Sequence, residues 1–200
     1  NPVISSHDSV ESSFSTSLSF DSIGNLYAGD PSVDNMSGKV FFFQSINTEP
    51  YLIYESNYTN PFIEQRAQFG AQLDNSNGWL FVGAPDFDNY RGTLVIYQTN
   101  PLGGISGSNT PSILSASGYQ PGYLFGWRMA SNPSFLAVSA LDLSGNSGGQ
   151  VELYQHDQGA WSSVGDFTSP TNINTDLFGY DLDIDNSYLV VGSPGTNNEK

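Results

Sequence analysis

The sequence predicts an all-β fold, a β-propeller made of four-stranded antiparallel blades. Two observations lead to this prediction: a pattern of four short strands recurs about every 55 residues, and turn-forming residues separate the apolar runs. The 200 residues include 21 Gly and 11 Pro, yet 38% of them are hydrophobic and 14% are aromatic. That many large apolar groups can fill a packed core, which distinguishes the chain from disordered sequences.

Each repeat begins with a Phe that is followed by an apolar residue four positions later. The four Phe residues are Phe14, Phe69, Phe125 and Phe178. The apolar residues that follow them are Leu18, Leu73, Met129 and Leu182. Because this pair recurs in register, we expect both positions to be buried between neighbouring blades.

The second strand of each repeat is an apolar run that ends at a corner of small residues. The four runs are 25–31, 79–85, 135–141 and 188–194. The corner Gly83-Ala84-Pro85 fits the end of a strand. Gly permits close backbone approach, and Pro lacks the N–H that would continue the ladder.

The third and fourth strands follow at similar distances in each repeat. A glycine opens the third strand in three repeats, at Gly38, Gly92 and Gly149. Weaker β segments over 51–54, 112–115 and 161–164 supply the fourth strand. A single small sheet cannot bury both of its apolar faces alone, so we expect the blades to stack on one another rather than form a β-sandwich.

Counting the repeats indicates that about three and a half blades are present. The repeats begin near residues 14, 69, 125 and 178 and fill one segment, 1–200, that is expected to be incomplete at both ends. Its outer faces lie near Val3-Ile4 and Leu189–Val191. We expect these faces to pack against the remaining blades of a longer propeller or against another chain of the same assembly.

The order Phe-Gly, Val-Gly-Ala-Pro and Gly-x-Val-x-x-Tyr resembles the FG-GAP repeat, the blade unit of integrin α-subunit propellers and of many bacterial surface proteins. The resemblance is strongest over 69–97, 125–154 and 178–194. It implies a seven-bladed ring. The first copy departs from the pattern at Phe14-Ser15 and 29–31, and the third copy departs at 139–141.

The charge balance excludes several classes of partner. Only 5 residues are Lys or Arg, whereas 20 are Asp or Glu, which gives a net charge of −15. Nucleic acids and anionic lipids bind through basic residues, so neither is expected as a partner, and no apolar run is long enough for membrane insertion. The absence of cysteine excludes disulfides and thiolate catalysis. Only 12% of the residues are charged, so the surface must be wetted mostly by Ser, Asn, Thr and Gln, and this composition is typical of extracellular or cell-surface β proteins.

The resemblance makes calcium the first cofactor to consider, because integrin-type repeats often carry Asp-rich loops between their first two strands. The corresponding linkers here are short turns, 74–78, 130–134 and 184–187, which lack the carboxylates of a calcium loop. The weak candidates for a metal site are Asp181, Asp183 and Asp185, whose alternation places them along a strand edge. We therefore expect no metal or other cofactor.

The candidate ligand-binding residues lie in two loops that connect second and third strands. The first loop contains Asp86, Asp88, Tyr90 and Arg91, and the second, 142–148, begins with Asp142. The resemblance places the first loop on the face that integrins use for ligands. The alternative is an ordinary turn, in which the acidic side chains cap backbone N–H groups and Arg91 pairs with Asp86 or Asp88.

Catalytic and modification motifs give weaker signals. The segment 145–149 matches a nucleophile elbow, but that motif needs a strand before it and a helix after it, so we expect no enzyme activity. Tyr58, Tyr119 and Tyr123 are expected in linkers, where sugars could stack on them. Asn35 and Asn57 lie in glycosylation sequons in expected loops.

Together these features predict a non-catalytic extracellular or cell-surface module. Its role would be recognition, adhesion or structure, with propeller loops presented to a protein or glycan ligand. Two alternatives stay open: a glycan-binding propeller, favoured if the linker tyrosines and Asp86 and Asp88 share one pocket, and an accessory propeller domain of a secreted hydrolase.

Overall fold

The structure is a computed structural model that describes residues 16–46, 52–62, 66–105, 110–115, 118–145, 147–171, 173 and 175–195. The predicted all-β class is confirmed, because three four-stranded antiparallel sheets and one two-stranded sheet follow one another along the chain. Several sequence-based expectations concern residues outside this part of the chain. They are Phe14-Ser15, the face near Val3-Ile4, Tyr51 at the start of the segment 51–54, and Asn146, which belongs to both the loop 142–148 and the segment 145–149.

Each sheet takes its strands in the order of the chain. The first sheet consists of β1 (Ser17–Phe20), β2 (Leu26–Asp30), β3 (Lys39–Ser45) and β4 (Leu52–Thr59). The second consists of β5 (Gln72–Ser76), β6 (Trp79–Ala84), β7 (Thr93–Gln98) and β8 (Ser112–Ser115). The third consists of β9 (Phe125–Ser131), β10 (Phe135–Ala140), β11 (Gln150–Asp157) and β12 (Ala160–Thr168). The last sheet pairs β13 (Leu182–Ile184) with β14 (Leu189–Val191).

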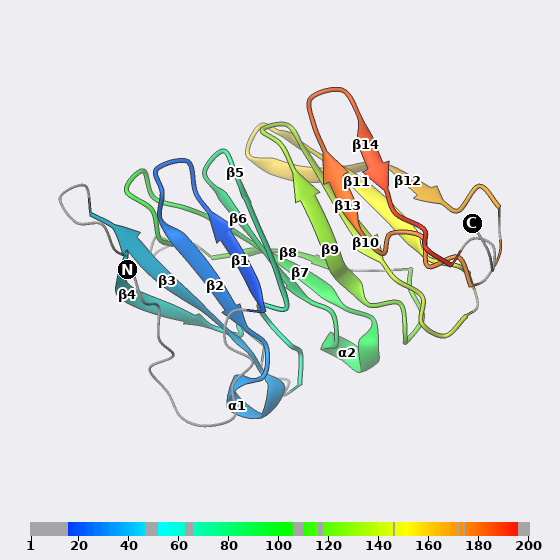
Figure 1. The fold of residues 1–200 in the computed structure, drawn as a ribbon, viewed down its shortest axis with the longest axis horizontal. Coiled ribbons are helices and arrows are strands. Elements are labelled where there is room, and N and C mark those ends of the chain that lie inside the picture. Colours follow the sequence, from blue (N-terminus) through cyan, green and yellow to red (C-terminus); the bar gives the residue numbers. More distant parts are fainter. Residues whose placement is uncertain are drawn as a thin grey trace.

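The sheets stand side by side along the long axis of the molecule (Figure 1). The first strands of successive repeats, β1, β5, β9 and β13, are neighbours in space. Two short helical turns, α1 (Val33–Met36) and α2 (Phe87–Tyr90), lie at one edge, and the tight hairpin turns β1–β2, β5–β6 and β13–β14 lie at the opposite edge. The sheets of the described residues do not close into a ring.

The core lies between sheets because the strands have apolar residues on both faces. In β6, Leu80 and Val82 pack toward the first sheet, against Tyr27 and Phe42. Phe81, between them in sequence, points the other way and packs against the third sheet. The two-residue period of a strand thus divides one apolar run between two interfaces.

The predicted burial of the repeat Phe is confirmed at the three described positions. Phe69 and Phe125 are fully buried, and Phe178 is 8% exposed. The prediction for the residue four positions later is wrong in the first repeat, where Leu18 is 53% exposed. Its counterpart Leu73 packs against the preceding sheet, whereas no described sheet precedes β1.

The glycines at the start of the third strands lie in close contact with the backbone of the next repeat. Gly38, Gly92 and Gly149 all have positive φ, and a Cβ on each would lie 2.1, 2.1 and 2.2 Å from the backbone oxygen of the next repeat's Phe. The N–H of Phe125 also donates to the carbonyl of Arg91, directly before Gly92, at 2.9 Å. The Phe of one repeat is therefore fixed by the glycine turn of the repeat before it.

A second close contact joins the two motif glycines of neighbouring repeats. A Cβ on Gly126, which follows the repeat Phe, would lie 3.4 Å from the Cα of Gly83 at the corner of the previous repeat. The third repeat has Ser139 in place of this corner glycine. The Ser139 hydroxyl accepts the N–H of Arg128 at 3.0 Å, and the β9–β10 pairing shifts register at this point. The departure from the motif thus coincides with an irregularity in the sheet.

The glycine contact leads to a first prediction, for Gly92→Ala. This change adds about 1–2 kcal/mol of left-handed backbone strain and about 1–3 kcal/mol for a clash with the Phe125 carbonyl. We expect the free energy of unfolding in urea to fall by about 2–5 kcal/mol. Gly159 is the matched control. Its φ is also positive, +85°, but no atom of another described part of the chain lies within 4 Å of the position that a Cβ would occupy. Equal losses for Gly92→Ala and Gly159→Ala would show that the contact does not matter.

A second prediction concerns Phe125→Ala, which removes a fully buried ring between the second and third sheets. Deleting a core aromatic costs about 3–5 kcal/mol, so the variant should unfold at markedly lower urea concentration. Phe167→Ala, at a position of β12 that is 44% exposed, should cost far less. Unchanged stability of Phe125→Ala would rule out the proposed register of the repeats.

Candidate functional site

The connection between β6 and β7, residues 85–92, is named the turn surface here. Its residues 88–90 all have positive φ, between 49° and 64°. The matching connection of the first repeat, residues 34–36, has the same conformation. Asp and Asn tolerate this region of φ/ψ space, and both connections place an Asp-Asn pair there. This shared pair was the sequence signal for the turn, and the sequence analysis overlooked it.

The turn surface is tied to the next repeat through its backbone. The carbonyl oxygen of Tyr90 accepts hydrogen bonds from the N–H groups of Gly122 and Leu124, at 3.1 and 2.9 Å. The Tyr90 side chain, by contrast, is 50% exposed. A fixed backbone with an exposed aromatic side chain is preorganised for contact with a partner, because little conformational entropy remains to be lost.

The charged side chains of the turn surface have neighbours within the chain. The Asp88 carboxylate lies 2.6 Å from the Arg91 guanidinium, which is one of the two pairings expected for Arg91. Asp86 accepts a hydrogen bond from the Gln68 amide at 2.7 Å. Burial raises the pKa of Asp86, and nearby Arg66 acts in the opposite direction. The pair Asp88–Arg91 is partly exposed and adds about 1 kcal/mol or less to stability.

Asp142 has a different environment from the other candidates, because it is only 1% exposed. One carboxylate oxygen accepts the N–H of Ser144 at 2.8 Å, and the other accepts the N–H of Ser147 at 2.6 Å. Burial by itself raises the pKa of Asp142, but the hydrogen bonds from Ser144 and Ser147 outweigh it and lower the pKa. Asp142 therefore shapes its loop from within, and we leave it out of the exposed contact surface.

The acidic residues considered for a metal lie around the last hairpin. Asp181 is directly before β13, Asp183 is within it, and Asp185 is in the turn that follows. The Asp185 carboxylate accepts the N–H groups of Ser187 and Tyr188, and these hydrogen bonds lower its pKa. Over the described ranges, no three or more His, Asp or Glu side chains are grouped so that they could hold a metal ion.

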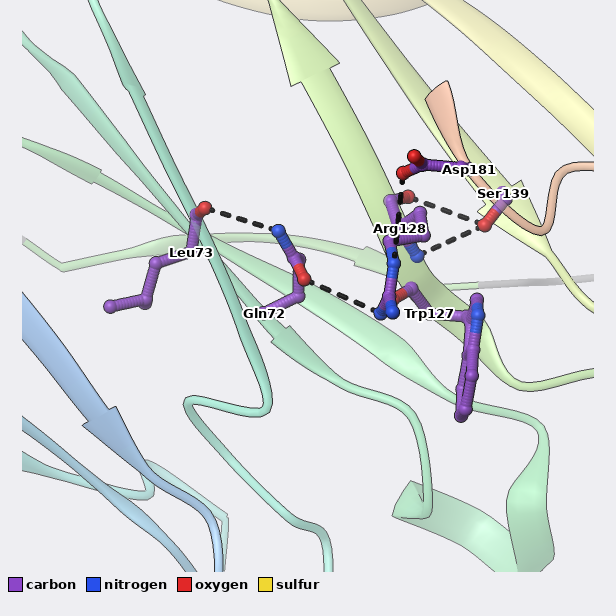
Figure 2. Close-up of polar contacts among 6 residues, drawn as sticks. All are labelled: Gln72, Leu73, Trp127, Arg128, Ser139 and Asp181. Atoms are coloured by element: carbon purple, nitrogen blue, oxygen red, sulfur yellow. Dashed lines mark hydrogen bonds and ion pairs between the residues drawn. The ribbon is translucent and has the colours of Figure 1, made fainter. Parts of the chain in front are cut away.

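A row of polar contacts crosses the first strands of three successive repeats (Figure 2). Gln72, Arg128 and Asp181 each lie three residues after the Phe of their repeat. The Arg128 guanidinium is 3.4 Å from the Gln72 amide oxygen and 3.9 Å from the Asp181 carboxylate, and its centre is 5.1 Å from the centre of the Trp127 ring system. This row was missed in the sequence analysis, although the shared position in the repeat indicates it.

The three tyrosines expected in linkers have different positions. Tyr119 and Tyr123 lie in the connection between β8 and β9 and line a cleft that also contains Glu152. Asp86 and Asp88 are not among the residues that line this cleft. The expectation for Tyr58 is wrong, since it lies within β4 and its hydroxyl accepts the N–H of Ile105 at 2.9 Å. The short apolar segment 51–54 had concealed the full length of that strand.

The sequons and the elbow motif are also located. Asn35 lies in the α1 turn, whereas Asn57 lies within strand β4 rather than in the expected loop, although both side chains are exposed. Ser147 of the elbow motif precedes a strand, and its hydroxyl donates to Asp142 at 3.0 Å. Its environment in the structure is therefore that of a loop serine.

Comparisons with known proteins do not identify a family for this chain. No protein-family model matches it, and no curated protein shows significant similarity to it. None of the helices in the described residues is long and apolar enough to cross a membrane.

The environment of Asp142 leads to a third prediction. A carboxylate whose pKa is lowered in the folded state stabilises the protein above its unfolded pKa of about 3.9, and this stabilisation is lost as the pH falls through the folded value. Asp142→Asn should therefore be less stable than the wild type at pH 6, and the difference should shrink toward about pH 2. Urea unfolding across this range measures it, with Asp157→Asn at the exposed end of β11 as control. A difference that stays constant down to the lowest pH would contradict the prediction.

Proposed function

We propose that the chain is a segment of an FG-GAP-type β-propeller and works as a non-catalytic recognition module. Two observations support the propeller: four-stranded sheets follow in chain order, and their first strands are neighbours. The Phe and Gly positions that define the resemblance also make the same inter-sheet contact in three repeats. The complete propeller is proposed to have seven blades.

The single observation that carries the recognition role is the turn surface. Its backbone is held by hydrogen bonds to the next repeat, while Tyr90 and the Asp88–Arg91 pair remain accessible at the edge that carries α1 and α2. Aromatic and Arg side chains contribute strongly to protein interfaces when their backbone is already ordered. We propose that this surface contacts a macromolecular partner, as loops on rigid scaffolds commonly do.

The proposed setting is extracellular or at the cell surface. The polar, Gly-rich composition, in which only 12% of the residues are charged, supports this location. Contact with nucleic acid is not part of the proposal, because only 5 basic residues are present and the described ones include Arg91 and Lys39, each paired with an Asp.

The end faces of the sheet stack are proposed to be covered by further blades or by another chain. Leu18 and Phe20 of β1 are 53% and 60% exposed, and Val190 of β14 is 63% exposed. The counterpart of Val190 in the second repeat is Phe81, which is fully buried against the next sheet. Covering these faces would extend to both ends the packing found between the inner sheets.

The proposed role predicts that Tyr90→Asn weakens partner binding about tenfold or more. Asn removes the ring but tolerates the left-handed backbone, so the turn should persist. The measurement is surface plasmon resonance of the intact protein against immobilised extracellular-matrix proteins. Tyr188→Asn is the matched control, because Tyr188 is 74% exposed in the β13–β14 turn at the opposite edge. Equal binding by both variants, or no binding partner in such a panel, would refute the role of the turn surface.

A further inference from the structure

A cleft of about 620 Å³ lies between the outer strands of the second and third sheets. Its walls come from β8, from the connection that carries Tyr119 and Tyr123, and from β11 and β12. Sites for small ligands commonly have volumes of about 300–1,000 Å³, with aromatic walls and a few polar groups that fix orientation. The cleft has this size and composition, and it uses none of the residues of the turn surface.

The charged side chain among the described residues that line the cleft is Glu152, which replaces an apolar residue of the first two repeats. It is the third residue after the strand-opening glycine, where the first two repeats have Phe41 and Val95. Val95 is fully buried in the core between the first and second sheets, and Phe41 is only 8% exposed. A carboxylate at a core position costs stability unless its polar interactions compensate. Such a local departure from a repeat pattern is the expected mark of a functional position.

The Glu152 carboxylate is held in place by two tyrosine hydroxyls. Tyr119 donates to one carboxylate oxygen at 2.7 Å, and Tyr154 donates to the other. Burial, followed by the hydrogen bond to Glu152, raises the pKa of both tyrosines, so both hydroxyls remain protonated donors at neutral pH. Each carboxylate oxygen can accept more than one hydrogen bond. Glu152 is thus oriented and still has acceptor capacity for a ligand.

The aromatic wall of the cleft is also fixed. The rings of Tyr119 and Tyr123 have centroids 5.2 Å apart, and Tyr119 stacks on the buried ring of Phe125 at 6.0 Å. The Gln150 amide adds a further polar group to the lining and is held by a hydrogen bond to Asp166 at 3.1 Å. The connection between β8 and β9 therefore offers two aromatic rings, tilted by 37° to each other, and β11 offers hydrogen-bond acceptors.

The charge and the side-chain types of the cleft lining favour one class of ligand. No Lys or Arg is among the described residues that line it, so an anionic ligand would meet Glu152 without a compensating charge from them. A pyranose ring presents C–H groups that pack on aromatic faces and hydroxyl groups that donate to carboxylates. We propose that the cleft between the second and third sheets binds a neutral carbohydrate, with a pyranose ring against Tyr119 and Tyr123 and its hydroxyls hydrogen-bonded to Glu152.

The test uses the intact protein and neutral disaccharides, namely maltose, cellobiose, lactose and N,N′-diacetylchitobiose. Saturation-transfer NMR identifies the sugar that binds, and calorimetry measures its dissociation constant. Glu152→Val installs the residue type of the second repeat, so the fold should be kept, and the thermal midpoint is measured beside binding because Tyr119 and Tyr154 lose their acceptor. Binding should weaken about tenfold to a hundredfold, the loss expected for hydrogen bonds to a charged group.

The control is Glu55→Val, which removes an acidic side chain at an exposed position of β4, and it should bind the sugar as the wild type does. Tyr119→Phe keeps the ring and removes one donor to Glu152, so it should weaken binding less than Glu152→Val.

The proposal is overturned if none of the four sugars binds at millimolar concentration or if binding survives Glu152→Val. It is also overturned if cationic glucosamine binds while all the neutral sugars fail. Tyr90→Asn should leave sugar binding unchanged, so this site and the turn surface are tested separately.

Discussion

The close backbone contact between a strand-opening glycine and the Phe of the next repeat is the constraint on which the rest of the structure depends. Gly92 can approach the carbonyl of Phe125 only because it has no side chain, and its positive φ turns the chain into β7. The contact sets the spacing of neighbouring sheets, so Phe125 and Phe81 reach the same core. It also anchors residues 88–90, whose exposed side chains form the turn surface. The packing of the sheets and the conformation of the turn surface thus have the same origin.

The positions where a repeat departs from its neighbours account for most of the polar features. Ser139 replaces a corner glycine and binds the backbone of Arg128, beside an irregular strand pairing. Glu152 replaces a core apolar residue and opens a polar cleft where the preceding interface has Val95. A scaffold of similar sheets can carry different polar features at different interfaces. Two neighbouring sheets stay packed as long as they keep the glycine contact and bury sufficient apolar area, so other positions can vary.

The candidate site could be predicted only in part. The pairing of Arg91 with Asp88 was foreseen as an alternative, because the two residues are three positions apart in one turn. The cleft was not foreseen, since Tyr119 and Glu152 are 33 residues apart and meet only when the second and third sheets pack together. Asp142 was expected to contact a ligand, but the folding of its own loop directs Ser144 and Ser147 onto its carboxylate. Local spacing reveals contacts within a turn, and it does not reveal contacts across an interface.

The sequence by itself determined the all-β class, the approximate positions of the strands apart from the full length of β4, and the burial of Phe69 and Phe125. Strand period, turn residues and repeat spacing are local properties that can be read from a linear pattern. The tertiary structure decided which glycines touch a neighbouring sheet, which tyrosines face a carboxylate and why Leu18 is exposed while Leu73 is buried. These outcomes depend on which sheet, if any, packs against each repeat. Two residues with the same local pattern can therefore have different environments, since burial and hydrogen bonding are set by the neighbouring sheet.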